Sequence, residues 1–209
     1  MNRIADDVIG GFNNFLQEQQ DSGPDARITL VQFNSQEPQN VVLSGAPIME
    51  AQPLSRQVYK PRGGTPLLDA TGQLIERARI EERLRSQNGL PPENILFVSI
   101  TDGAENDSHI FSGDRIRSMI KECESHGWTF VFLSADLDTY AGARLLGVKQ
   151  GSTQAFSADS EGVHTAMYSI SMKTREFRDK KRTGLAAEKD DFFGVDKPAE
   201  EIRRRKDRS

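Results

Sequence analysis

The chain has 209 residues, a formal net charge of -4 and 36% hydrophobic residues, a size that suits one α/β domain with or without a tail. The acidic balance argues against a nucleic-acid partner, and the single cysteine, Cys123, excludes an intramolecular disulfide and a thiolate zinc cluster. No segment approaches the roughly 18 apolar residues of a membrane helix, and residues 1–7 lack a signal-peptide pattern, so we expect a cytoplasmic protein with no membrane partner.

The first twenty residues predict an amphipathic helix, because apolar side chains recur there at helical spacing. These are Ile4, Val8, Ile9, Phe12, Phe15 and Leu16. Gly10 and Gly11 interrupt the pattern, and a glycine pair inside a helix indicates that another backbone approaches closely. A turn at 21–24 then leads to two expected strands, 27–33 and 41–48, which we expect to pair as a hairpin.

Helices and apolar strands alternate through the rest of the chain. The expected helices are 65–84, 114–126, 140–146 and 161–173, and the expected strands are 94–100, 128–135 and 154–157. The runs NILFVSI and WTFVFLSA are predominantly apolar, which is typical of strands buried on both faces of a parallel sheet. This alternation predicts an α/β fold: a doubly wound, mostly parallel open sheet with helices on both faces.

Charge divides the chain unevenly. Residues 175–209 contain 12 Lys/Arg and 9 Asp/Glu, net +3, whereas the preceding residues contain 15 and 22, net -7. The basic segment has few large apolar side chains, and such a composition cannot bury enough surface to offset its ordering entropy. We therefore expect one domain over 1–173 and a charged tail over 174–209 that is mostly disordered or loosely helical, in which Phe192 and Phe193 form a candidate partner-binding motif.

Polar residues gather where the apolar strands end, which is where ligands bind in open α/β sheets. Thr65 lies in the segment PRGGTP before an expected helix, where it suits the N-cap position with Pro66 at N1. Asp102 follows the most apolar strand, and an aspartate there is costly to bury unless it is paired or metal-bound. Taken alone, the Thr65 segment is better explained as a plain helix start, whereas a plain strand-to-loop turn explains the Asp102 segment as well as a site does. Ser134–Asp136 is best explained as a turn.

Together, Thr65 in GGTPLLDA and Asp102 in SITDG resemble the von Willebrand factor type A domain, and the match spans roughly residues 1–173. The resemblance implies a metal-ion-dependent adhesion site with Thr65 and Asp102 among its ligands. It also implies Mg²⁺ or Mn²⁺ as the cation and a protein partner that presents an Asp or Glu carboxylate. Oxygen donors of this kind suit a hard cation that keeps several waters.

The sequence departs from that family at its amino end. No Asp-x-Ser-x-Ser motif occurs, and no apolar strand precedes the opening helix. We therefore expect that the chain begins one strand late, without the central strand that the resemblance places between 27–33 and 94–100. The two facing edges would carry unpaired backbone groups, which cost stability, and metal binding by Thr65 and Asp102 would be weak or absent.

Three functions remain open at this stage. The first is a non-enzymatic protein-binding module, and the second is a metal-dependent hydrolase of phosphate esters, although no general base or nucleophile is evident near Thr65 and Asp102. The third is a non-functional fragment.

Among the other candidate residues, we expect Cys123 to lie in the core and to be unreactive. We expect Asp69 to complement the helix dipole, and residues 105–107 either to rim the site or to form a solvated loop.

Overall fold

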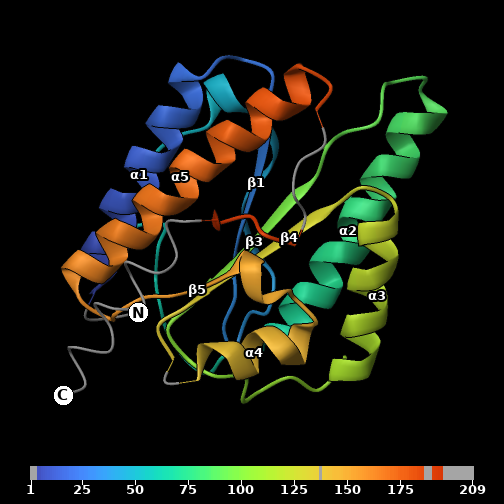
Figure 1. Cartoon of the computed structure of the whole chain (residues 1–209). Coiled ribbons are helices and arrows are strands. Elements are labelled where there is room, and N and C mark those ends of the chain that lie inside the picture. Colours follow the sequence, from blue (N-terminus) through green and yellow to red (C-terminus); the bar gives the residue numbers. More distant parts are fainter. Residues whose placement is uncertain (1–3, 137, 186–189, 195–209) are drawn as a thin grey trace.

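Two separate β-sheets form the centre of the computed structural model, which describes residues 4–136, 138–185 and 190–194. One is an antiparallel hairpin and the other is parallel (Figure 1). The hairpin pairs β1 (Arg27–Gln32) with β2 (Asn40–Pro47), and the parallel sheet has the order β3 (Leu96–Thr101), β4 (Thr129–Ser134), β5 (Thr153–Ala155). The predicted α/β class and the hairpin are confirmed, but the single open sheet that we expected is divided in two.

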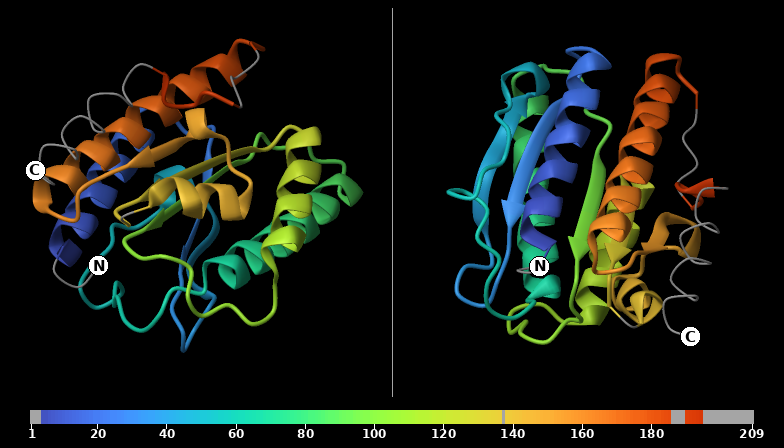
Figure 2. Two further views of the ribbon diagram at one scale, coloured as in Figure 1. Left: turned by 60° about the horizontal axis from the view of Figure 1, so that its bottom comes forward. Right: turned by 90° about the vertical axis from the view of Figure 1, so that its left-hand side faces the viewer.

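Helices cover both faces of these sheets (Figure 2). α1 (Ala5–Asp21) and α5 (Ser160–Arg182) pack against each other on one face. α2 (Leu67–Gln87), α3 (Gly113–Ser125) and α4 (Thr139–Leu146) lie toward the other. None of the described helices has the length and apolar character needed to cross a bilayer.

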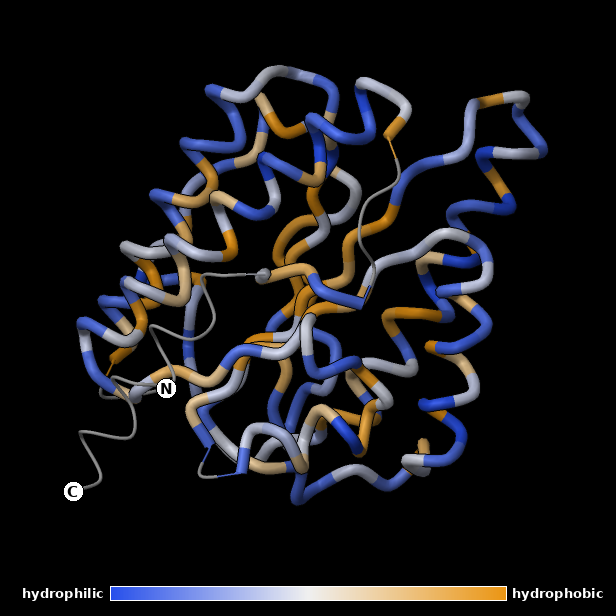
Figure 3. Tube along the Cα trace, viewed as in Figure 1, coloured by the Kyte–Doolittle hydropathy of each residue, from blue (hydrophilic) through white to orange (hydrophobic). Residues whose placement is uncertain are grey.

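The strands direct alternate side chains into two hydrophobic layers, as the period of two in a strand requires. On β3, Phe97 packs with the α2 and α3 layer, whereas Val98 packs with the α1 and α5 layer. Every residue of β4 is buried, which explains the apolar run Phe130–Leu133 between its terminal Thr129 and Ser134. Hydrophobic segments accordingly concentrate along the central strands and the inner faces of the helices (Figure 3).

The two sheets adjoin along β1 and β3, which are not hydrogen-bonded to each other. β1 pairs with β2 along one edge, and β3 pairs with β4 along one edge. Among the described residues, the opposite edges of β1 and β3 have no strand partner.

The last helix extends beyond the expected domain boundary. Lys173 lies inside α5, which continues to Arg182 and buries Phe177 and Arg178. Phe193 is fully buried in the same core, and its amide donates to the Gly151 carbonyl at 3.2 Å. The segment after Lys173 therefore contributes to the packed core through α5 and 190–194, while residues 195–209 of the expected tail lie outside the described part.

Candidate functional site

Thr65 and Asp102 lie together at the carboxyl ends of β1 and β3. Both residues line a cavity of about 480 Å³ that opens between these strands. A Cβ atom placed on Gly103 would lie only 3.0 Å from the Thr65 hydroxyl oxygen. The loop that carries Asp102 therefore approaches Thr65 closely, and a side chain at position 103 would crowd it.

Reciprocal hydrogen bonds join the two loops. The Thr65 amide donates to Asn106 Oδ1 at 2.8 Å, and the Asn106 amide donates to the Thr65 carbonyl at 3.3 Å. The Gly64 amide donates to the Ser35 hydroxyl, which brings the loop after β1 to the same place. Gly63 has a φ of +73° beside Ser35, a conformation that glycine adopts without strain.

The start of α2 differs from the expectation that Thr65 is its N-cap. The helix begins at Leu67, two residues later than expected, and its N-cap Pro66 forms no side-chain cap. The Leu68 amide donates instead to Glu105 Oε2 at 2.8 Å, and the Ser108 hydroxyl accepts from the amides of Leu68 and Asp69, each at 3.1 Å. Capping from a distant loop leaves the Thr65 side chain available for another role.

Asp69 holds residues 109–111, in the loop that follows β3. Its carboxylate is buried and accepts from the amides of His109, Ile110 and Phe111 at 2.8–2.9 Å. We expected Asp69 only to complement the helix dipole, so this role was missed. Because its oxygens are occupied by backbone donors, Asp69 is a structural residue of the site.

The remaining polar residues of the loop also serve its conformation. Glu105 Oε1 accepts from the amides of Asp107 and Ser108 at 2.9 and 2.8 Å. Asp107 Oδ1 lies 3.6 Å from Nε2 of the exposed His109. At the end of β4, the Ser134 hydroxyl accepts from the Asp136 amide at 3.0 Å, the turn geometry that we expected there.

The oxygen donors suited to a cation are few. Thr65 offers a hydroxyl and Asp102 a carboxylate, both half-buried at the cavity mouth. Within the described ranges, no group of three or more His, Cys, Asp or Glu side chains is placed to hold a metal ion. Mg²⁺ accepts sites with one or two protein carboxylates because it keeps several waters, so the donors have the right chemistry for an open, weak site.

No protein-family model matches the sequence of this chain, and a search of curated proteins finds no match.

Several residues that build the site carry no signal in the sequence. Ser35, Asn106 and Ser108 are single polar residues in polar loops, and each acts on a backbone group about 30–40 positions away in the chain. Glu105 was considered only as a rim residue. Local patterns do not reveal such partners, because the contacts form only when the two loops meet.

Cys123 lies outside the site, in the layer between α2 and α3. It is buried, as expected, and the Arg79 guanidinium donates to its Sγ at 3.3 Å. Burial raises the pKa of the thiol above its usual value, although the Arg79 contact acts in the opposite direction. The protonated, covered thiol suits a structural role.

Proposed function

We propose that the chain is a protein-binding module of the von Willebrand factor type A class with an incomplete metal-ion-dependent adhesion site. The observation that supports this most directly is the reciprocal Thr65–Asn106 pair, which holds Thr65 beside the Asp102 loop. The parallel sheet with helices on both faces is compatible with that class. The carboxyl ends of its strands are also where such folds bind ligands.

In this proposal Thr65 and Asp102 hold Mg²⁺ or Mn²⁺, which supplies positive charge for capturing an Asp or Glu carboxylate of a protein partner. The chain's own residues position the two oxygen donors: Asn106 fixes the Thr65 backbone, and Gly103 allows the loops to approach. With so few protein ligands, most of the coordination sphere is water. Metal affinity is therefore low until a carboxylate joins it.

Titration of Mn²⁺, followed by electron paramagnetic resonance of the free ion, tests this proposal. We expect millimolar binding that Asp102→Ala abolishes and that a peptide with one central glutamate tightens. Asp107→Ala is the matched control, since it removes a carboxylate of the same loop that lies beside His109. Its affinity for Mn²⁺ should stay close to that of the unchanged protein.

Other results would contradict the proposal. Micromolar Mg²⁺ binding in isothermal titration would show that the site is complete. Hydrolysis of a generic phosphate ester that Asp102→Ala abolishes would favour a metal-dependent hydrolase. A molten species without cooperative unfolding would favour a non-functional fragment, whereas the module should unfold cooperatively.

A further inference from the structure

Ile110 is the most exposed large apolar side chain among the described residues, with an exposed fraction of 66%. It lies in the loop after β3, the same loop that carries Asp102. A single exposed apolar side chain is common on protein surfaces and needs no special role. Ile110 differs because its backbone is held in place, so that the side chain is displayed in a fixed position.

Hydrogen bonds and packing hold that backbone. Asp69 Oδ1 accepts from the amides of Ile110 and Phe111 at 2.9 and 2.8 Å. The Phe111 ring packs directly against α2, where a Cβ added to Gly72 would lie 2.7 Å from three of its atoms. The side chain of Ile110 is itself stiff at χ1 because it is β-branched. Ile110 therefore loses little conformational freedom when another surface covers it, and this lowers the cost of binding.

Ile110 also lies near the candidate site, because its loop runs alongside the segment that leads into α2 (Figure 1). Three hydrogen bonds follow one another along the two segments. They join Asn106 to Thr65, Ser108 to Leu68, and Ile110 to Asp69. Asp69 comes four positions after Thr65, which is about one helical turn. The backbone of Ile110 is therefore held about one turn away from Thr65.

Charge at the mouth of the 480 Å³ cavity complements an acidic partner. Lys60 and Arg62 line this cavity together with Asp102, and both basic side chains are exposed. Arg62 lies 3.3 Å from Glu37, whereas Lys60 has no ion-pair partner within the part of the chain that the structure describes. Lys60 thus attracts negative charge to the same end of the molecule as Ile110.

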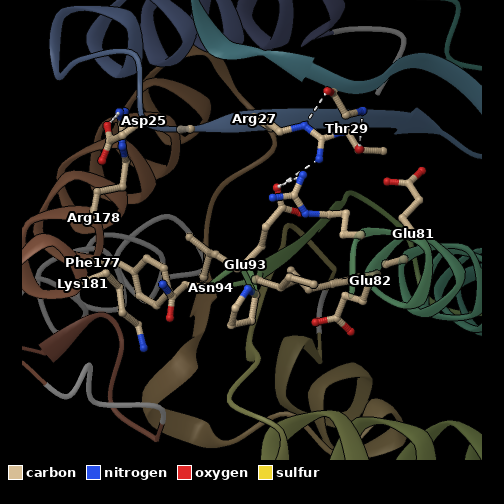
Figure 4. A pocket seen from close by; sticks show the side chains of 18 of the residues that line it. Asp25, Arg27, Thr29, Glu81, Glu82, Glu93, Asn94, Phe177, Arg178 and Lys181 are labelled. Carbon is tan, nitrogen blue, oxygen red and sulfur yellow. Dashed lines mark hydrogen bonds and ion pairs between the residues drawn. The ribbon is translucent and has the colours of Figure 1, made fainter. Parts of the chain in front are cut away.

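The opposite end of β1 and β3 has a different character. The cavity of about 680 Å³ there is lined by charged side chains that are joined to one another (Figure 4). Arg27 lies 3.0 Å from Glu93, and Arg178 lies 2.6 Å from Asp25. Much of the charge at that end is therefore neutralised within the chain.

We propose that Ile110 determines specificity for the protein partner by contacting an apolar side chain close to the metal-bound carboxylate. The partner segment is thus recognised by an acidic and an apolar residue together. In an extended segment, residues two positions apart lie on the same side, about 6.6 Å from each other, a spacing similar to one helical turn. The inference rests on the proposed function, because the metal held by Thr65 and Asp102 binds the carboxylate.

Two fluorescent seven-residue peptides, titrated in Mn²⁺ and followed by fluorescence anisotropy, test this inference. Both have a central glutamate. One has leucine two positions away on each side, and the other has serine at those positions. Contact between Ile110 and a leucine removes apolar surface from water, so the unchanged protein should bind the leucine peptide about ten-fold more tightly.

Ile110→Ala should bind the two peptides with equal affinity. This variant keeps the backbone amide that donates to Asp69, and circular dichroism should show an unchanged fold because the side chain is exposed. Ile80→Ala is the matched control. Ile80 is also an exposed isoleucine, but it lies within α2, so its removal should leave the preference for the leucine peptide intact.

The outcomes separate this inference from the proposed function. A preference for leucine that persists in Ile110→Ala, or equal affinity of the unchanged protein for both peptides, would overturn the role of Ile110. Binding of both peptides that requires Mn²⁺ would then still support metal-bridged capture. No binding of either peptide in Mn²⁺, or binding that EDTA leaves unchanged, would overturn both proposals.

Discussion

The carboxylate of Asp69, near the start of α2, accepts from the backbone amide of Phe111 at 2.8 Å, a contact that joins residues far apart in sequence. The same carboxylate accepts from two further amides of the loop. Because this group is buried, Asp69→Ala would leave three donors without their partner. We expect a loss of about 2–4 kcal/mol in the free energy of unfolding, measured by urea denaturation.

Asp69→Asn is the matched variant for this prediction. Its amide oxygen can still accept from Ile110 and Phe111, which share one carboxylate oxygen, whereas the His109 contact is lost. The loss should be smaller than for Asp69→Ala. Equal stability of Asp69→Ala and the unchanged protein would mean that the carboxylate does not hold the loop.

The two adjacent glycines of α1 should respond oppositely to alanine. A Cβ on Gly11 would lie 2.6 Å from Met167 Cγ of α5, whereas a Cβ on Gly10 would have nothing within 4 Å. Gly11→Ala should therefore lower the free energy of unfolding by about 1–3 kcal/mol through overpacking. Gly10→Ala should raise it by up to about 1 kcal/mol through helix propensity. Thermal unfolding of both variants checks this, and effects of the same sign would contradict the close approach of α1 and α5.

Stability should depend on pH through Asp25. Hydrogen bonds from Arg182 and then Arg178 lower the pKa of its carboxyl well below the usual range. A lowered folded-state pKa contributes stability that is present above the unfolded value of about 3.9 and is lost as the pH falls toward the folded value. Well above the unfolded pKa of about 3.9 the carboxyl is ionised in both the folded and the unfolded chain. The difference in unfolding free energy between the unchanged protein and Asp25→Asn should therefore be constant from about pH 5 to 8.

Below about pH 4 that difference should shrink. Urea denaturation at several pH values measures it. Asp21→Asn is the control, since Asp21 accepts a hydrogen bond from the neutral Gln17 and its removal changes the net charge equally. A difference for Asp25→Asn that persists unchanged at low pH would show that the Arg182 and Arg178 contacts do not stabilise the folded chain.

Docking of segment 190–194 should be measurable through Phe193, whose side chain is fully buried. Phe193→Ala should cost about 3 kcal/mol, in line with other buried phenylalanines. Leu185→Ala is the control, because Leu185 is 62% exposed, and it should change the free energy of unfolding by less than about 0.5 kcal/mol. Similar effects of the two variants would mean that the segment does not contribute to the core.

Most elements of the fold could be predicted from local patterns. The apolar run around Phe130 predicts a buried strand, and the spacing of Val8 and Phe12 predicts a helix, because both signals depend on neighbours within a few positions. The end of α5 was missed because the charged residues after Lys173 resemble a solvated tail. Only the burial of Phe177 and Arg178 against other elements extends the helix to Arg182.

The sequence by itself determined the α/β class, the hairpin and the positions of Thr65 and Asp102 at strand ends. The tertiary structure decided how those positions are held: Asn106 bonds to Thr65, Glu105 and Ser108 cap α2, and Asp69 fixes the loop. It also extended α5 beyond Lys173 to Arg182. The physical reason is the separation in sequence over which each interaction acts. Periodicity and turn chemistry act between neighbours, whereas hydrogen-bond partners and strand neighbours depend on where distant segments meet.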